Sequence, residues 1–135
     1  MKTLIIAINS QYVHTNLAVN YLRAACGNDC GDVRVLEFSI NENLKWIFRR
    51  IMAEKPDIVA FSCYIWNIEH VVKLAGDIKK ADKEIIVIAG GPEVSFESGG
   101  LISGTADYII CGEGEEDLLF LLRLLNSGER PDENI

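Results

Sequence analysis

The chain has 135 residues, a length that suits one domain with its own hydrophobic core. Apolar residues make up 49% of the sequence and charged residues 24%, a composition that excludes wholesale disorder. The 20 acidic and 13 basic side chains give a net charge of −7. That charge argues against nucleic acid as a partner, because binding to its phosphate backbone depends on clustered Lys and Arg.

The first apolar run, Leu4–Ile8, follows a lysine and is similar to the start of a signal peptide. It is only five residues long, and no small-residue cleavage site follows it. No other uninterrupted apolar run is longer, so the sequence predicts no membrane span. We therefore expect a buried strand at this position, no membrane partner and a cytoplasmic protein.

Five short apolar runs rich in β-branched residues alternate with segments of helical periodicity. Strands that are apolar along their whole length indicate a parallel sheet covered by helices on both faces. The predicted strands are Thr3–Ile8, Val33–Phe38, Ile58–Phe61, Ile85–Ala89 and Tyr108–Ile110.

Apolar residues at helical spacing predict a helix after each strand. The predicted helices lie around Leu17–Ala25, Leu44–Met52, Ile68–Ile78, Glu93–Ile102 and Glu113–Leu125, and Asn126-Ser127-Gly128 ends the last of them. The sequence therefore predicts a three-layer, doubly wound α/β domain of the flavodoxin-like or Rossmann-like type. Its five-stranded parallel sheet is expected in the order 2-1-3-4-5, because right-handed crossovers leave few alternatives.

Residues 1–127 are expected to form this domain, and the polar tail 128–135 is predicted to be a linker to a further domain. The leucines of the last predicted helix cover more than one face. This pattern is typical of a helix that packs on a missing neighbour, and equally of one well buried in its own domain.

In a sheet of this order, ligands bind at the carboxyl ends of the strands, around the switch between strands 1 and 3. Four loops reach that edge, and three of them combine small residues with polar groups and aromatic rings. The mixture favours a large, flat ligand that the backbone approaches closely. The candidate binding residues are Asn9, Ser10, Gln11, Tyr12, Ser62, Tyr64, Ile65, Trp66, Gly90, Gly91, Pro92, Glu93, Gly112, Glu113 and Gly114.

Ordinary structural explanations exist for the same residues. Gly90 and Gly91 are also typical of a strand-to-helix turn. An acidic residue such as Glu113 complements the dipole at a helix start. Tyr64 and Trp66 are equally compatible with partly buried loop aromatics.

Several chemistries are disfavoured by what stands at these strand ends. A phosphoacceptor receiver domain requires acidic residues after strands 1 and 3, where this chain has Asn9 and Ser62. No G-x-G-x-x-G follows strand 1, and Ser10 and Thr15 alone make a poor flavin phosphate loop.

The sequence also indicates no complete active site or metal centre. No Ser/His/Asp or Cys/His arrangement follows from its spacing, so the chain alone is expected to bind rather than to catalyse. Cys26 and Cys30 are close in sequence, but no third Cys or His accompanies them. Because zinc and iron–sulfur sites require three or four ligands, we expect free thiols.

Together the loops resemble the cobalamin-binding domain of B12-dependent radical SAM proteins, as found at the N-terminus of anaerobic magnesium-protoporphyrin IX monomethyl ester cyclase-like proteins. The resemblance runs over essentially the whole chain. Its carrying segments are Leu4–Ser10, Pro56–Ser62, Ile88–Glu93 and Asp107–Glu115. In this order, at these strand ends, the set is fairly specific.

Cobalamin domains of the methionine synthase and mutase type carry D-x-H-x-x-G after strand 1, and the histidine ligates cobalt from below. Those positions read Asn9, Gln11 and His14 here, so aspartate, histidine and glycine are all absent. The serine of the S-x-L motif falls on Ser62, with Tyr64 in place of leucine. The resemblance thus implies a base-off cobalamin with no histidine below the cobalt.

The resemblance also implies a larger enzyme. A radical SAM domain in cis would hold a 4Fe–4S cluster that cleaves S-adenosylmethionine, and the corrinoid would serve methyl transfer or a related radical step. The whole protein is then expected to be a radical SAM methyltransferase or a cyclase-like enzyme. Two alternatives stay open: a flavodoxin-like regulatory or interaction module that binds no corrinoid, and a domain that binds a flavin or another nucleotide.

The paired glycines give a first expectation. A bulky residue at Gly90 or at Gly91 is predicted to abolish corrinoid retention while leaving the fold intact.

Overall fold

The computed structural model describes residues 1–10, 24–25, 30–64, 66–91, 104–110 and 115–131. Its strands are β1 (Lys2–Asn9), β2 (Asp32–Ser39), β3 (Ile58–Ser62), β4 (Ile86–Gly90) and β5 (Tyr108–Ile110). They form one five-stranded sheet in the order β2-β1-β3-β4-β5, and every pair of neighbours is parallel. The predicted architecture and strand order are confirmed.

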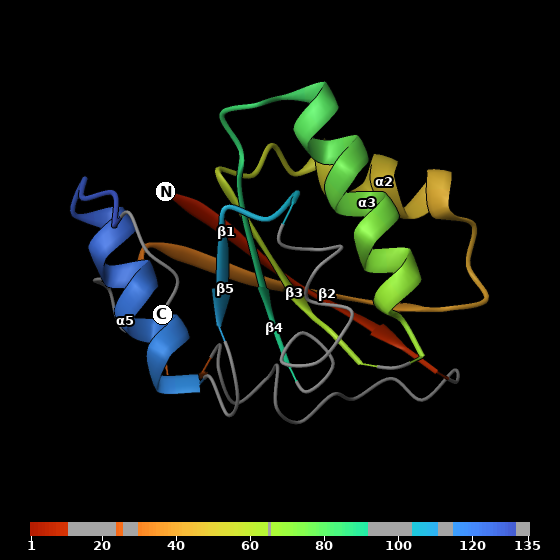
Figure 1. The fold of residues 1–135 in the computed structure, drawn as a ribbon, viewed down its shortest axis with the longest axis horizontal. Helices are drawn as coiled ribbons and strands as arrows, with labels where there is room; N and C mark the ends of the chain where they lie inside the picture. The colour runs from red at the N-terminus through yellow and green to blue at the C-terminus, as the bar shows by residue number, and fades with distance from the viewer. Residues whose placement is uncertain (11–23, 26–29, 65, 92–103, 111–114, 132–135) are drawn as a thin grey trace.

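Helices cover both faces of the sheet (Figure 1). Helices α2 (Leu44–Ala53) and α3 (Ile68–Ala81) lie on one face, and α5 (Glu115–Asn126) lies on the other. Because successive strand residues point to opposite faces, Leu4 and Ile6 pack toward α2 and α3, whereas Ile5 and Ala7 pack toward α5. The central strand β1 is therefore buried on both sides, which explains its continuous apolar run.

Three of the five predicted helices are confirmed as α2, α3 and α5. Of the first predicted helix, the described residues Ala24 and Ala25 are helical, and the rest lies outside the described residues. The predicted helix at Glu93–Ile102 lies wholly outside them.

Four of the five strands differ from the prediction by one residue at one or both ends, and in one case a predicted strand residue lies outside its strand. We expected a strand from Ile85, but β4 begins at Ile86. The N–H of Ile85 donates to the carbonyl of Asp82 at 3.3 Å and closes a turn after α3. Its apolar side chain is buried all the same, so the hydrophobic pattern could not distinguish this turn residue from a strand residue.

The end of α5 follows the prediction. Gly128 has a φ of +93°, and the N–H of Glu129 donates to the carbonyl of Leu124 at 3.1 Å. A glycine in the left-handed region with such a bond is a common way to close a helix. The leucines 118, 121, 122 and 125 are buried within the domain, while Phe120 is 55% exposed.

Among the described residues, no helix is both long and apolar enough to cross a bilayer. The division into a domain of residues 1–127 and a linker of 128–135 stays a prediction.

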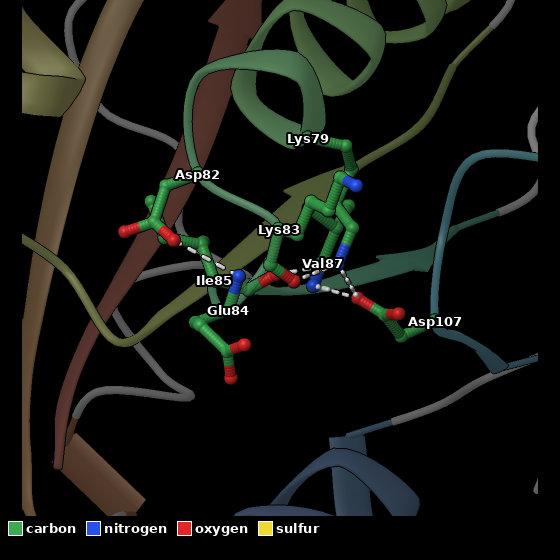
Figure 2. A network of polar contacts seen from close by, with 7 residues as sticks. All are labelled: Lys79, Asp82, Lys83, Glu84, Ile85, Val87 and Asp107. Atoms are coloured by element: carbon green, nitrogen blue, oxygen red, sulfur yellow. Dashed lines mark hydrogen bonds and ion pairs between the residues drawn. The ribbon is translucent and has the colours of Figure 1, made fainter.

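A polar network at the amino-terminal end of β4 ties α3 to the sheet (Figure 2). The Lys79 ammonium donates to the carbonyl of Ile85 at 2.8 Å and to Oδ2 of Asp107 at 2.9 Å. The same Asp107 oxygen accepts the backbone N–H of Val87 at 2.8 Å. One carboxylate thus accepts hydrogen bonds from both a lysine of α3 and a backbone N–H of β4.

We expect Asp107→Ala to lower the free energy of unfolding by about 1–3 kcal/mol, because it leaves both donors without this acceptor. Urea unfolding followed by circular dichroism measures the change. The matched control is Asp77→Ala, which removes an exposed pair with Lys73 on α3 and should change stability by about 0.5 kcal/mol or less. Equal effects of the two substitutions would contradict the assigned role of the network.

Candidate functional site

The carboxyl ends of β1, β3 and β4 meet at one edge of the sheet, as predicted. Ser62 at the end of β3 pairs with Gly90 at the end of β4. Just beyond them, the N–H of Cys63 donates to the Gly90 carbonyl at 2.6 Å. The edge therefore includes the switch point between β1 and β3 at which sheets of this order bind ligands.

A stacked pair of aromatic rings lies in the loop after β3. The ring centroids of Tyr64 and Trp66 are 4.5 Å apart, and the two planes differ by 3°. The indole Nε1 of Trp66 donates to the carbonyl of Ile8 near the end of β1, at 3.1 Å. Trp66 is still 42% exposed. The indole is thus anchored through its polar atom, while much of its apolar surface remains open to solvent.

Asn67 is hydrogen-bonded to the same loop and to the ends of two strands. Its side-chain Nδ2 donates to the carbonyls of Ile8 and Ser62, both at 3.0 Å. Its Oδ1 accepts the backbone N–H of Tyr64 at 2.8 Å. With 1% exposure, Asn67 is a buried polar residue with both amide atoms hydrogen-bonded.

The two glycines after β4 have different structural roles. A Cβ at Gly90 would have the Cβ and carbonyl oxygen of Ile110 as its nearest neighbours, at 3.7 Å, which is ordinary contact. Gly91 has a φ of +111°, and a Cβ there would lie 2.5 Å from the Cys63 carbonyl oxygen. The expectation that substitution at either glycine spares the fold is therefore wrong for Gly91, because the backbone of the β3 loop fills the space its side chain would need.

The remaining described candidates surround this edge. Asn9 ends β1, and its Nδ2 donates to Oε1 of Glu37 on β2 at 3.4 Å. Ser10 is exposed directly after it, and Ser62 is half-buried at the end of β3. The structure therefore brings Asn9, Ser62, Gly90 and the stacked aromatic pair to one edge.

The other candidates lie outside the described residues: Gln11, Tyr12, Ile65, Pro92, Glu93, Gly112, Glu113 and Gly114. Their assignment to the site stays a prediction.

No metal-binding cluster occurs among the residues that the structure describes, because no three His, Cys, Asp or Glu side chains converge there. His70, near the start of α3, has its Nε2 3.2 Å from the carbonyl of Ile40. Cys30 is a buried free thiol, and Cys26, the cysteine close to it in sequence, lies outside the described residues.

The described edge suits a large ring system with polar substituents. The stacked rings offer a flat apolar surface, Gly90 places no side chain over the strand end, and Ser62 adds a hydroxyl. A corrinoid requires these features: flat contact, close backbone approach and a few polar partners. The described residues therefore fit such a group.

Sequence reasoning did not single out Asn67 as a site residue. It directly precedes the apolar stripe of α3, where an asparagine is normally interpreted as a helix N-cap. No local sequence signal distinguishes a capping asparagine from one whose partners lie on other strands.

Comparison with known proteins identifies the family of this domain. Residues 3–121 match the protein family described as B12 binding domain. The chain belongs to this family. The resemblance to B12-binding domains found in the sequence is confirmed.

Two curated proteins are similar to part of this B12-binding domain. One is the 2-(S-pantetheinyl)-carbapenam-3-carboxylate methyltransferase of Streptantibioticus cattleyicolor, 37% identical over 62 residues. The other is the cobalamin-dependent radical SAM methyltransferase TokK of Streptomyces tokunonensis, 36% identical over 63 residues. The matches cover 44% and 45% of this chain but only 9% of each relative's length.

Solved structures share the fold of this B12-binding domain. The cobalamin-dependent S-adenosylmethionine radical enzyme OxsB superposes with a TM-score of 0.69 and 17% identity, over 98% of this chain and 19% of OxsB. A cobalamin-binding protein from Desulfitobacterium hafniense gives 0.61 and 18%, over 89% of this chain and 56% of that protein. A LuxR family response regulator from Silicibacter pomeroyi gives 0.58 and 17%, over 100% and 97%. At these identities the likeness concerns the fold.

The difference between the two glycines is directly testable. Gly91→Ala is expected to lower the free energy of unfolding by about 1–3 kcal/mol, because alanine is strained at this φ and its Cβ meets the Cys63 backbone. Gly90→Ala should leave stability unchanged or raise it by about 0.5 kcal/mol, because alanine loses less backbone entropy on folding. Parallel urea unfolding curves of the two variants decide the matter, and an equal loss in both would refute the assignment.

Proposed function

We propose that this chain is the cobalamin-binding domain of a B12-dependent radical SAM enzyme, and that it holds a corrinoid base-off at the carboxyl edge of its sheet. One observation carries the proposal: the chain belongs to the B12-binding domain family over residues 3–121. The two curated relatives supply the enzyme context, since one is named a cobalamin-dependent radical SAM methyltransferase and the other a methyltransferase.

The described residues support a specific mode of binding. The exposed face of Trp66, backed by the parallel ring of Tyr64, would pack against or near the face of the ring system. Gly90 would allow close approach to the end of β4, and Ser62 would offer a polar contact next to it. These residues orient the group and exclude water from one side of it.

The proposal of a base-off state rests on the residues available as a lower ligand. The family's ligand histidine corresponds to Gln11 in this sequence. Among the described residues, the single histidine, His70, already has its Nε2 within 3.2 Å of the Ile40 carbonyl. Apolar aromatic surface below the ring system would then take the place of a nitrogen ligand.

We further propose a radical SAM domain in cis that holds a 4Fe–4S cluster and S-adenosylmethionine. When bound, the corrinoid would supply the methyl group for transfer or assist a related radical step. The matched segments cover 9% of each curated relative, so most of such an enzyme would lie outside the region compared.

Retention of hydroxocobalamin is the primary test. The purified chain is mixed with hydroxocobalamin and desalted, and its visible spectrum is recorded beside that of free cobalamin. We expect a retained chromophore with a base-off spectrum. A colourless protein would contradict corrinoid binding by this chain, and a bound yellow chromophore after purification would favour a flavin.

A substitution pair locates the site. Gly90→Leu should weaken hydroxocobalamin binding about 10-fold to 100-fold, because it would place a large side chain at the end of β4, where the glycine would let the ring system approach the backbone. The matched control is Gly76→Leu on α3, where an added Cβ meets nothing within 4 Å. The same titration of both variants distinguishes the two positions. Undiminished binding by Gly90→Leu would place the ligand elsewhere.

His14 tests the absence of a nitrogen ligand. His14→Ala should leave the spectrum of the bound cobalamin unchanged, since no histidine is expected below the cobalt. A shift from a base-on to a base-off spectrum on this substitution would refute the proposed base-off state.

A further inference from the structure

Asn67 occupies a helix N-cap position without capping the helix. It precedes α3, yet its side chain makes no hydrogen bond to the free N–H groups of the first turn. Asn43, at the same position before α2, does cap: its Oδ1 accepts the N–H groups of Lys45 and Trp46 at 2.8 and 3.4 Å. The two asparagines thus share a position in sequence relative to their helices, but not a role.

The three side-chain hydrogen bonds of Asn67 go to the edge of the sheet instead. They join the end of β1 through the Ile8 carbonyl, the end of β3 through the Ser62 carbonyl, and the β3 loop through the Tyr64 N–H. A normal capping bond stabilises a helix, and Asn67 does not supply that stabilisation to α3. The benefit of its three bonds must therefore lie in the loop geometry.

The loop geometry that Asn67 fixes is that of the aromatic pair. The backbone N–H of Tyr64 donates directly to Oδ1 of Asn67, and Trp66 donates to the same Ile8 carbonyl to which Asn67 donates. The Trp66 ring directly, and the Tyr64 backbone through Asn67, are consequently both tied to the Ile8 carbonyl of β1. A stack that served only to fill the core would be buried, whereas Trp66 is 42% exposed.

We propose that Asn67 is a positioning residue: it holds Tyr64 and Trp66 in the arrangement that receives the flat ring system of a corrinoid, and so sets the affinity by preorganisation. This inference rests on the proposed function of the same edge. Ordering the rings before binding removes an entropic cost that the ligand would otherwise meet.

Two variants separate positioning from an ordinary structural role. Asn67→Ala removes all three bonds. Asn67→Ser keeps a residue that caps helices well, but its short side chain cannot span the distance to the two strand carbonyls. The matched control is Asn43→Ala, which removes the cap of α2. A Trp46→Phe background leaves Trp66 as the only tryptophan, since the chain has two.

Binding and ring order are then measured on the same proteins. Hydroxocobalamin titrations give the apparent Kd, urea unfolding gives stability, and acrylamide quenching with anisotropy reports the mobility of Trp66. If the rings hold their binding arrangement a tenth of the time in the Asn67 variants, the apparent Kd rises about tenfold. We expect this rise in Kd, with stronger quenching and lower anisotropy of Trp66, for both Asn67→Ala and Asn67→Ser. Asn43→Ala should bind hydroxocobalamin as tightly as the parent, which is the Trp46→Phe protein without a further substitution.

Three results would overturn the inference: parental affinity in Asn67→Ser, unchanged quenching of Trp66 in both Asn67 variants, or a loss of affinity in Asn43→Ala that matches theirs. Failure of the proposed function has a different signature, because the parent itself would then retain no hydroxocobalamin. In that case the quenching experiment still decides whether Asn67 orders the rings, and ligand recognition by the pair is refuted.

Discussion

The carboxyl edge of this sheet depends on the backbone carbonyl of Ile8. It lies near the end of β1, beyond the last residue pair that joins β1 to β3, at Ile6 and Phe61. Where strand pairing ends, a buried carbonyl requires another donor. Here the indole of Trp66 and the amide of Asn67 both donate to it. Satisfying one buried oxygen therefore fixes the loop after β3 against β1 and creates the aromatic surface at the switch point.

The two ends of the sheet differ in the interactions that their residues make. At the amino-terminal end, Asp107 and Lys79 join α3, β4 and the segment before β5 through polar bonds within the protein (Figure 2). At the carboxyl end, Gly90 carries no side chain and Trp66 exposes an aromatic face. With the proposed function, stability and recognition would be supplied by opposite edges, and the loops would carry function on a rigid scaffold.

The fold alone does not select the ligand. A response regulator and a cobalamin-binding protein superpose on this chain with similar TM-scores of 0.58 and 0.61. The residues at the strand ends differ from those of a phosphoacceptor site: Asn9 and Ser62 stand where such a site requires acidic groups, and the aromatic pair adds a flat surface. The family match agrees with this interpretation of the loops.

Apolar periodicity and chain connectivity were sufficient to predict the five parallel strands, their order and the helices α2, α3 and α5, because each signal acts between residues close in sequence. Composition at the strand ends also indicated which loops form the candidate site. These local patterns could not predict three features: the first residue of β4, the different structural roles of Gly90 and Gly91, and the hydrogen bonds made by Asn67. Asn67 resembles a helix cap until Ile8, 59 residues away in the chain, is brought within hydrogen-bond distance. Such contacts exist only after folding, because they join groups whose proximity no local pattern encodes.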